Sequence, residues 1–163
     1  MTAIRHLAQL NIGRLRYPTD DPRVADFMNN LDLVNSLAER SKGFVWRLKD
    51  DSGNATNIRP FAEPTMIVNM SVWENVETLE RFVWQTIHKR FYGRRPEWFD
   101  KMQKPHFVMW WVVAGHRPTI EEAKERLEYL TAHGPSDHAF GWGSVPAAQL
   151  WKTARCAPDG QAA

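Results

Sequence analysis

The sequence has little of several residue types and patterns that often reveal a function. It contains a single cysteine, Cys156, in 163 residues. One cysteine forms no intramolecular disulfide, and it excludes zinc sites that need two or more cysteines. The formal net charge is only +2. So small a charge gives no support to nucleic acid or an acidic membrane as the partner.

Long hydrophobic runs are also missing. The longest apolar stretch, 107–114, is far shorter than the roughly 20 residues that a membrane-spanning helix needs. The N-terminal segment carries Arg5 and His6 but no apolar core of a signal peptide. We therefore expect a cytoplasmic protein with no membrane partner.

Three groups of catalytic motif are absent as well. The chain has no glycine-rich nucleotide-binding loop, no G-x-S-x-G nucleophile elbow and no H-E-x-x-H metal motif. These absences argue against nucleotide cofactors, covalent nucleophilic catalysis and a catalytic metal. We therefore predict no metal site and no resident cofactor.

Large aromatic residues, in contrast, are abundant, with eight Trp and eight Phe against three Tyr. Such side chains fill cores, line small-molecule pockets and form oligomer interfaces. The 43% of hydrophobic residues and 25% of charged residues are globular proportions. The length predicts a single domain, which we place at 1–153, followed by a disordered tail at 154–163.

Hydrophobic periodicity predicts an α+β fold, with strands where apolar residues alternate and helices where they recur at helical spacing. The expected strands are 6–15, 44–49, 65–73 and 106–114, and the expected helices are 22–42, 75–95 and 120–133. The order β-α-β-β-α-β is that of a ferredoxin-like domain with a four-stranded antiparallel sheet, here with an extra C-terminal helix.

The two faces of the predicted sheet differ in character. In the first strand Ala8, Leu10 and Ile12 alternate with polar residues. We expect the polar set of the first and third strands to face away from the helices: Gln9, Asn11, Asn69 and Ser71. That face then has no helix to cover it, so we predict a homodimer formed sheet to sheet.

Four stretches carry a family resemblance. The segment VNMSVWENVETLERFVWQTIHKRF resembles the signature of the dimeric α/β-barrel superfamily. The segments AQLNIGRL, GFVWRLKDDSGNAT and WWVVAGHRPTIEEAKERLEYLTAHGP resemble an uncharacterised bacterial family within it, over roughly 7–135. The resemblance implies a homodimer whose two sheets close into one barrel with a ligand cavity. Relatives include antibiotic-biosynthesis-type monooxygenases without cofactors, haem-degrading oxygenases, haem peroxidases, isomerases and plain ligand binders, so no single activity is implied.

The haem-degrading branch of that superfamily carries an Asn on its first strand and a Trp and a His on its second barrel helix. This chain has Asn11 and His88, but Phe82 stands where the branch has its Trp, and His88 comes about one turn early. Haem therefore remains an alternative to the prediction of no cofactor.

His88 and Asn11 are the predicted catalytic residues. An imidazole titrates near neutral pH, so His88 is the candidate proton acceptor. The amides of Asn11 and Asn69 are candidates to orient a substrate carbonyl or to stabilise a developing oxyanion. The structural alternatives are a half-exposed histidine bonded to the backbone, and polar residues in a wet dimer interface.

Aromatic and cationic side chains complete the predicted substrate site. Four tryptophans are candidates to line a pocket, with dimer packing as the alternative: Trp46, Trp73, Trp84 and Trp110. Arg59 and His116 are candidates to bind an acidic group of the ligand. Arg94 and Arg95 lie near a predicted helix end, where the helix dipole alone favours cations.

Three interpretations fit these patterns. The first is an enzyme acting by proton transfer on an aromatic or polyketide-like small molecule, as a cofactor-independent monooxygenase, an isomerase or a cyclase. The second is a non-catalytic dimeric module that binds a small molecule or haem. The third is a structural dimer whose cavity is filled by its own tryptophans.

Overall fold

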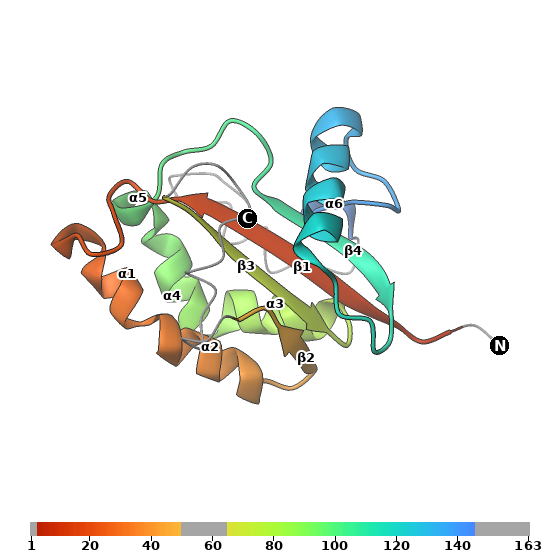
Figure 1. Cartoon of the computed structure of the whole chain (residues 1–163). Helices are drawn as coiled ribbons and strands as arrows, with labels where there is room; N and C mark the ends of the chain where they lie inside the picture. The colour runs from red at the N-terminus through yellow and green to blue at the C-terminus, as the bar shows by residue number, and fades with distance from the viewer. Residues whose placement is uncertain (1–2, 50–64, 146–163) are drawn as a thin grey trace.

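The computed structural model describes residues 3–49 and 65–145. Its centre is a four-stranded antiparallel sheet in the order β2-β3-β1-β4 (Figure 1). The strands are β1 (Arg5–Arg14), β2 (Phe44–Arg47), β3 (Met66–Trp73) and β4 (Phe107–Val113). This arrangement confirms the predicted α+β class and the β-α-β-β-α-β order. The predicted tail at 154–163 and the candidate Arg59 lie outside the described residues.

Helices form both connections that cross between strands. A 3-10 turn, η1 (Pro22–Val24), and the helices α1 (Ala25–Asn29) and α2 (Leu31–Arg40) join β1 to β2. The helices α3 (Val76–Gln85), α4 (Ile87–Gly93) and α5 (Arg95–Trp98) join β3 to β4. The predicted C-terminal helix is α6 (Ile120–His133), and the short turn η2 (Trp142–Ser144) follows it. In the described segments, no helix is long and apolar enough to span a membrane.

The sequence predicted one helix over 75–95, and the structure divides it at Thr86. The backbone of Thr86 is extended, with φ −120° and ψ −174°. Its hydroxyl donates to the carbonyl of Phe82 and accepts from the backbone N–H of His88 at 3.2 Å. Threonine side chains compete with helical backbone bonds in this way. As a result His88 lies in the first turn of a new helix and not on the same helix as Trp84.

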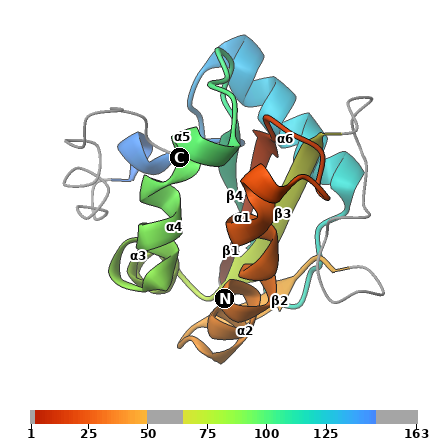
Figure 2. The ribbon, with the colours of Figure 1, turned by 90° about the vertical axis from the view of Figure 1, so that its left-hand side faces the viewer.

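The two faces of the sheet pack against different layers (Figure 2). One face carries the apolar alternation of β1 and packs against α6, whose Ala123, Leu127 and Leu130 join that cluster. The other face packs against α2 and α3 through a second, aromatic-rich cluster. β4 is apolar on both faces, as its sequence predicts, because Met109 belongs to the second cluster and Trp110 to the first.

This arrangement corrects one prediction about the sheet. The polar set of Gln9, Asn11, Asn69 and Ser71 faces the helices α1 to α5, not away from them. The apolar face is the one opposite those helices, and α6 packs on it over β4 and β1, where Leu10 and Val108 are almost completely buried. The reason given for a homodimer, a face that no helix covers, is therefore wrong. The homodimer itself stays a prediction.

An irregularity in β2 divides its aromatic residues between the faces. Phe44 pairs with Trp73 and Trp46 pairs with Val72, so the register shifts between them. Phe44 consequently packs in the aromatic cluster beside Trp73, while Trp46 packs against the α6 cluster. Simple alternation had placed both on one face. The bulge adds the extra residue that breaks this alternation.

Candidate functional site

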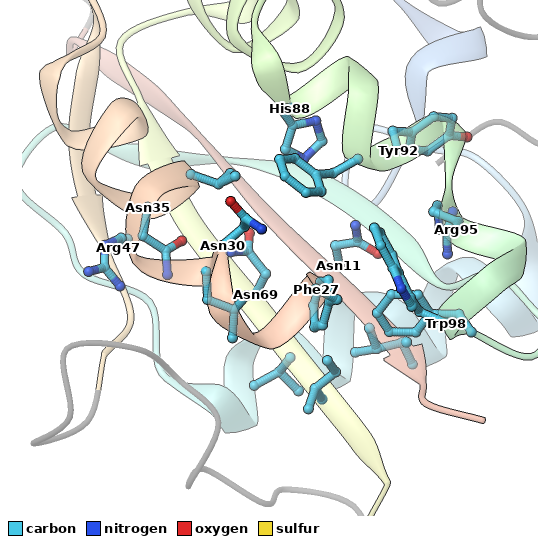
Figure 3. Close-up of a pocket in the computed structure, with 18 of the residues that line it drawn as sticks. Asn11, Phe27, Asn30, Asn35, Arg47, Asn69, His88, Tyr92, Arg95 and Trp98 are labelled. Atoms are coloured by element: carbon cyan, nitrogen blue, oxygen red, sulfur yellow. The ribbon is translucent and has the colours of Figure 1, made fainter. Parts of the chain in front are cut away.

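The polar face of the sheet and the helices above it leave a pocket of about 160 Å³. Asn11, Gly13 and Asn69 line it from β1 and β3, and α1 with α2 forms one wall. The opposite wall is α4 with α5, where His88 and Arg95 lie (Figure 3). The pocket thus lies between the two helical connections that the fold places on this face.

Five aromatic side chains belong to the apolar wall of this pocket. They are Phe27 of α1, Phe91 and Tyr92 of α4, Trp98 of α5, and Phe99. Phe27 packs against both Trp98 and Phe99, with ring centroids 5.5 Å and 5.1 Å apart. Gly13 is needed beneath them, because a Cβ there would lie 2.6 Å from the ring of Phe99. These contacts fix the shape of the aromatic end.

A smaller pocket of about 50 Å³ shares Asn11, Asn69 and His88 with the first. It reaches further along the polar face to Trp73 and to Trp142 of η2. The indole N–H of Trp142 is buried and has no hydrogen-bond partner among the described residues. Together the two pockets form one cavity system with His88 and the two asparagines at its centre.

His88 is half-buried and keeps one ring nitrogen available. Its Nδ1 lies 3.2 Å from the carbonyl oxygen of Val83. A carbonyl only accepts hydrogen bonds, so the neutral ring carries its proton on Nδ1, and Nε2 is left as an acceptor. Burial lowers the pKa of His88 from 6.5 to about 4, and the positive charge of Arg95 adds to this effect. At neutral pH the imidazole is therefore uncharged and able to accept a proton or hydrogen bond.

The amide groups beside His88 are oriented by a hydrogen-bond network. Nε2 of Gln9 donates to Oδ1 of Asn69 and to Oγ of Ser71, each at 2.8 Å. Nε1 of Trp73 also donates to Oγ of Ser71, at 2.9 Å. Because Gln9 occupies the oxygen of Asn69, the amide nitrogen of Asn69 is the end left to donate. The side chain of Asn11 has no hydrogen-bond partner within the described part of the chain.

Arg95 brings a positive charge to the aromatic end of the pocket. Its Nη1 donates to Nε2 of His106 at 3.0 Å. Burial, with the charge of Arg95 as the second cause, lowers the pKa of His106 to about 4, so this ring is a neutral acceptor at pH 7. The guanidinium also lies over the ring of Tyr92, with its carbon 5.3 Å from the centroid. Arg95 is therefore held in place without a carboxylate.

The structure brings together four of the predicted site residues. His88, Asn11 and Asn69 line both pockets, and Trp73 lines the smaller one. Their chemical roles remain predictions.

The other described candidates lie outside the two pockets. Trp84 packs beside Tyr92 and Trp142, and Trp46 packs on the α6 face. Trp110 is fully buried on that face and donates from Nε1 to Glu122 at 2.8 Å. His116 is exposed and pairs with the same Glu122.

Sequence reasoning missed the wall formed by α4 and α5. It attributed Arg95 to a helix end, and it assigned no role to Phe91 or Trp98. A signal was present, because the aromatic pairs 91–92 and 98–99 flank the two arginines that precede Pro96. A proline in that position breaks the helix and turns the following side chains in a new direction.

No group of three or more metal-ligating side chains occurs within the described segments. Nearly all polar groups of the cavity are amides, hydroxyls or cations, which are poor ligand sets for a divalent ion. The arrangement is suited instead to binding an organic molecule through hydrogen bonds and aromatic contacts.

Comparison with known families gives a match over residues 6–156, to the family described as a domain of unknown function, DUF3291. The chain belongs to the DUF3291 family. No curated protein matches it. The family assignment extends over almost the whole chain but brings no activity with it.

Several solved structures resemble the DUF3291 chain. A conserved protein from Methanosarcina mazei has a TM-score of 0.44 and 12% identity, covering 68% of this chain and 93% of that one. A protein of unknown function from Nitrosomonas europaea has a TM-score of 0.44 and 11% identity, covering 72% of this chain and 97% of that one. SnoaB, a cofactor-independent oxygenase from Streptomyces nogalater, has a TM-score of 0.40 and 14% identity, covering 71% of this chain and 96% of that one. At these scores and identities the similarities assign no activity to this chain.

Proposed function

We propose that the pocket is the active site of an enzyme that removes a proton from a small aromatic or enolisable substrate. The observation that carries the proposal is His88, a neutral imidazole whose free Nε2 lies in a cavity beside the unpartnered amide of Asn11 and the amide nitrogen of Asn69. Enolate or phenolate formation requires a proton acceptor and hydrogen-bond donors for the developing oxyanion. His88 supplies the first, and Asn11 with Asn69 supplies the second.

The hydrogen bond from Nδ1 of His88 to Val83 supports the role of base. It fixes the ring orientation and leaves only Nε2 to take the proton. A group whose pKa is about 4 is a weak base, so the substrate anion must be stabilised as it forms. The amide nitrogen of Asn69 and the side chain of Asn11 are placed for that stabilisation, because neither donates to another described side chain.

The size of the pocket favours a substrate of one or two rings. An apolar cavity of about 150 Å³ holds a benzene molecule, and this pocket measures about 160 Å³. Drug-sized ligands occupy pockets of roughly 300–1,000 Å³, so a porphyrin would not be enclosed here. The residues present therefore do not fit haem, and no step is routed through a cofactor.

The product depends on the fate of the anion. Return of the proton to another carbon gives an isomerisation. Addition of the anion to dioxygen, followed by loss of water, gives a monooxygenation. The substrate CH₂ becomes a carbonyl, and of the two atoms of O₂ one enters the carbonyl and the other leaves as water. Both reactions begin with removal of a proton from the substrate, so proton abstraction is the step to test.

Proton abstraction is measured directly by hydrogen–deuterium exchange. 2-Indanone and phenylpyruvate, which carry acidic C–H groups beside a ring, are incubated with the protein in D₂O and followed by proton NMR. We expect exchange above the buffer rate, and His88→Gln lowers it by about 10²–10⁴-fold, the usual contribution of a general base. Asn11→Ala lowers it by about 10²–10³-fold, the usual cost of one oxyanion donor.

The matched control is His116→Gln. His116 is exposed, pairs with Glu122 and lies outside the pocket, so this variant keeps the wild-type rate. Exchange that is equally fast in His88→Gln and wild type rejects His88 as the base.

A binding module without catalysis is the second candidate, and the low pKa of His88 favours it. A neutral imidazole with one free nitrogen is a good hydrogen-bond acceptor even where it is a weak base. In that case the aromatic ketones bind, as judged by NMR shifts, but no variant and no wild type exchanges their protons. The homodimer prediction is tested separately, by light scattering of the full chain.

A further inference from the structure

The cavity has an uneven charge distribution. Among the described residues that line the two pockets there is no Asp or Glu. Two arginines do, Arg47 and Arg95, and they lie toward opposite ends of the larger pocket (Figure 3). Nε of Arg47 donates to Glu39 at 2.7 Å, so its charge is compensated. Within the described part of the chain Arg95 makes no ion pair.

The neighbouring Arg94 shows how differently the two arginines are used. Arg94 donates to Glu97 at 2.8 Å and to Asp26 at 3.1 Å, lies over the ring of Trp98, and does not line the pocket. Arg95 points to the cavity, and its hydrogen bond goes to the uncharged acceptor His106. Two carboxylates thus compensate the charge of Arg94. The charge of Arg95 has no carboxylate partner among the described residues.

We infer that the pocket takes a small aromatic carboxylate, with its carboxylate on Arg95 and its ring against Phe91, Trp98 and Phe99. This deepens the proposed function by naming its substrate class, but it concerns binding and holds whether or not turnover follows.

Guanidinium geometry favours a carboxylate as the anion. The group presents five N–H donors in a planar fork that matches two carboxylate oxygens. His106 occupies one donor of Arg95, on Nη1, and no described side chain takes the others. A charge half-buried beside aromatic rings loses part of its hydration, and an anionic partner compensates that loss.

The aromatic half of the ligand follows from the surroundings of Arg95. The rings of Phe91 and Trp98 stack with centroids 6.0 Å apart, and Phe99 lies edge-on to Phe27. Phe99 borders the guanidinium of Arg95, whose carbon lies 6.0 Å from the ring centroid, and Phe91 and Trp98 line the same pocket. A flat ring carrying a carboxylate therefore satisfies both parts of the site, whereas an aliphatic acid leaves the aromatic part unfilled.

His106 acts as a positioning residue in this arrangement. It lies at the start of β4, is 8% exposed, and accepts from Arg95 through Nε2. Replacement by Leu removes the acceptor, while replacement by Gln retains an oxygen that can accept. The preference for the carboxylate should fall in His106→Leu and return in His106→Gln, a pattern that a purely space-filling role would not produce.

The test compares benzoate with benzamide, which has the same shape but no charge. Both are titrated into the wild-type protein at pH 7 and followed by NMR. We expect benzoate to bind at least about tenfold more tightly, since a hydrogen-bonded charged group is worth about 1.5–3 kcal/mol. Arg95→Gln brings the ratio of the two affinities close to one. Arg94→Gln, the matched control, leaves the ratio unchanged.

Equal affinities of wild type for benzoate and benzamide overturn the inference without any variant. So does a preference that survives in Arg95→Gln, provided that its circular dichroism shows a folded chain. The two proposals fail separately. A benzoate preference without proton exchange supports the carboxylate site and contradicts the catalytic role of His88. Exchange of 2-indanone without a benzoate preference supports the catalytic role and contradicts the carboxylate site.

Discussion

The two faces of the sheet are packed in opposite ways. On the α6 face the strands contribute mainly aliphatic side chains and Trp110, and these residues are buried. On the other face Asn11, Asn69 and Gln9 lie under helices that leave a cavity above them. Consecutive residues of the same strand, such as Leu10 and Asn11, therefore serve different purposes. The filled face stabilises the domain, and the hollow face is available to a ligand.

The pocket side holds several polar groups that are uncharged or without partners. They are His88 and His106 with their lowered pKa values, the unpartnered amide of Asn11 and the unpartnered indole N–H of Trp142. The α6 side has such a group too, in Nδ1 of His6. Buried polar groups without partners lower stability. Those beside the cavity are expected when a site is kept for binding at a cost to the stability of the fold.

We expect the largest effect from acid, which should lower the free energy of unfolding through the two histidines of the pocket side. His88 and His106 have pKa values of about 4 when folded, against 6.5 ordinarily. Between these values the unfolded chain binds more protons, so stability is complete above about pH 6.5 and falls as the pH drops toward 4. Lowering a pKa from 6.5 to about 4 corresponds to about 3 kcal/mol at most for each histidine. Urea unfolding at pH 7 and at pH 4.5 measures the loss.

Variants separate these histidines from the other titrating groups. His88→Gln and His106→Gln should each flatten the decline between pH 6.5 and 4.5, whereas the exposed His133→Gln should not. Carboxylates in ion pairs, such as Glu97 with its lowered pKa, lose their contribution only below about pH 4.5. If the free energy of unfolding falls as steeply with pH in His88→Gln and His106→Gln as in wild type, these two histidines do not cause the acid sensitivity.

The next comparison uses two adjacent residues of β1. Leu10→Ala, on the filled face, should lower the free energy of unfolding by about 2–5 kcal/mol, the usual range for a buried leucine. Asn11→Ala, on the hollow face, should change it by less than about 1 kcal/mol, because its amide makes no side-chain hydrogen bond in the described structure. Urea titration of both variants gives the two values. Equal losses would mean that the two faces contribute alike to stability.

Most of the fold follows from the sequence, and the direction of the polar face does not. The strands, the C-terminal helix and the apolar character of both faces of β4 were readable from the spacing of apolar residues. Alternation separates two faces but carries no information on which layer covers each. Here α6 takes the apolar face, so the polar set meets the other helices.

The candidate site was predicted in part for similar reasons. His88 stood out for its imidazole, and Asn11 and Asn69 stood out for their amides on one face of the predicted sheet. Arg95 did not stand out, because its importance comes from a long-range contact with His106 and from the break at Thr86. Contacts between distant segments and breaks within an apparently continuous helix depend on tertiary structure, which periodicity does not encode.

The break at Thr86 supplies the smallest and most specific prediction. Its hydroxyl caps α4 and bonds back to Phe82, so Thr86→Ala should cost about 0.5–2 kcal/mol, the usual value of an N-cap. Loss of the cap should also allow α3 to continue into α4, which turns His88 away from Val83 and toward solvent. NMR titration should then show the pKa of His88 rising from about 4 toward 6.5.

Thr86→Ser is the matched control, because serine keeps the hydroxyl that caps the helix and accepts from His88 N–H. It should retain both the stability and the low pKa. A raised pKa in Thr86→Ala alone would show that one side-chain oxygen holds the catalytic candidate over the hollow face. An unchanged pKa would mean that packing of Phe82 against the imidazole, with ring centroids 5.2 Å apart, is sufficient to keep His88 in the pocket.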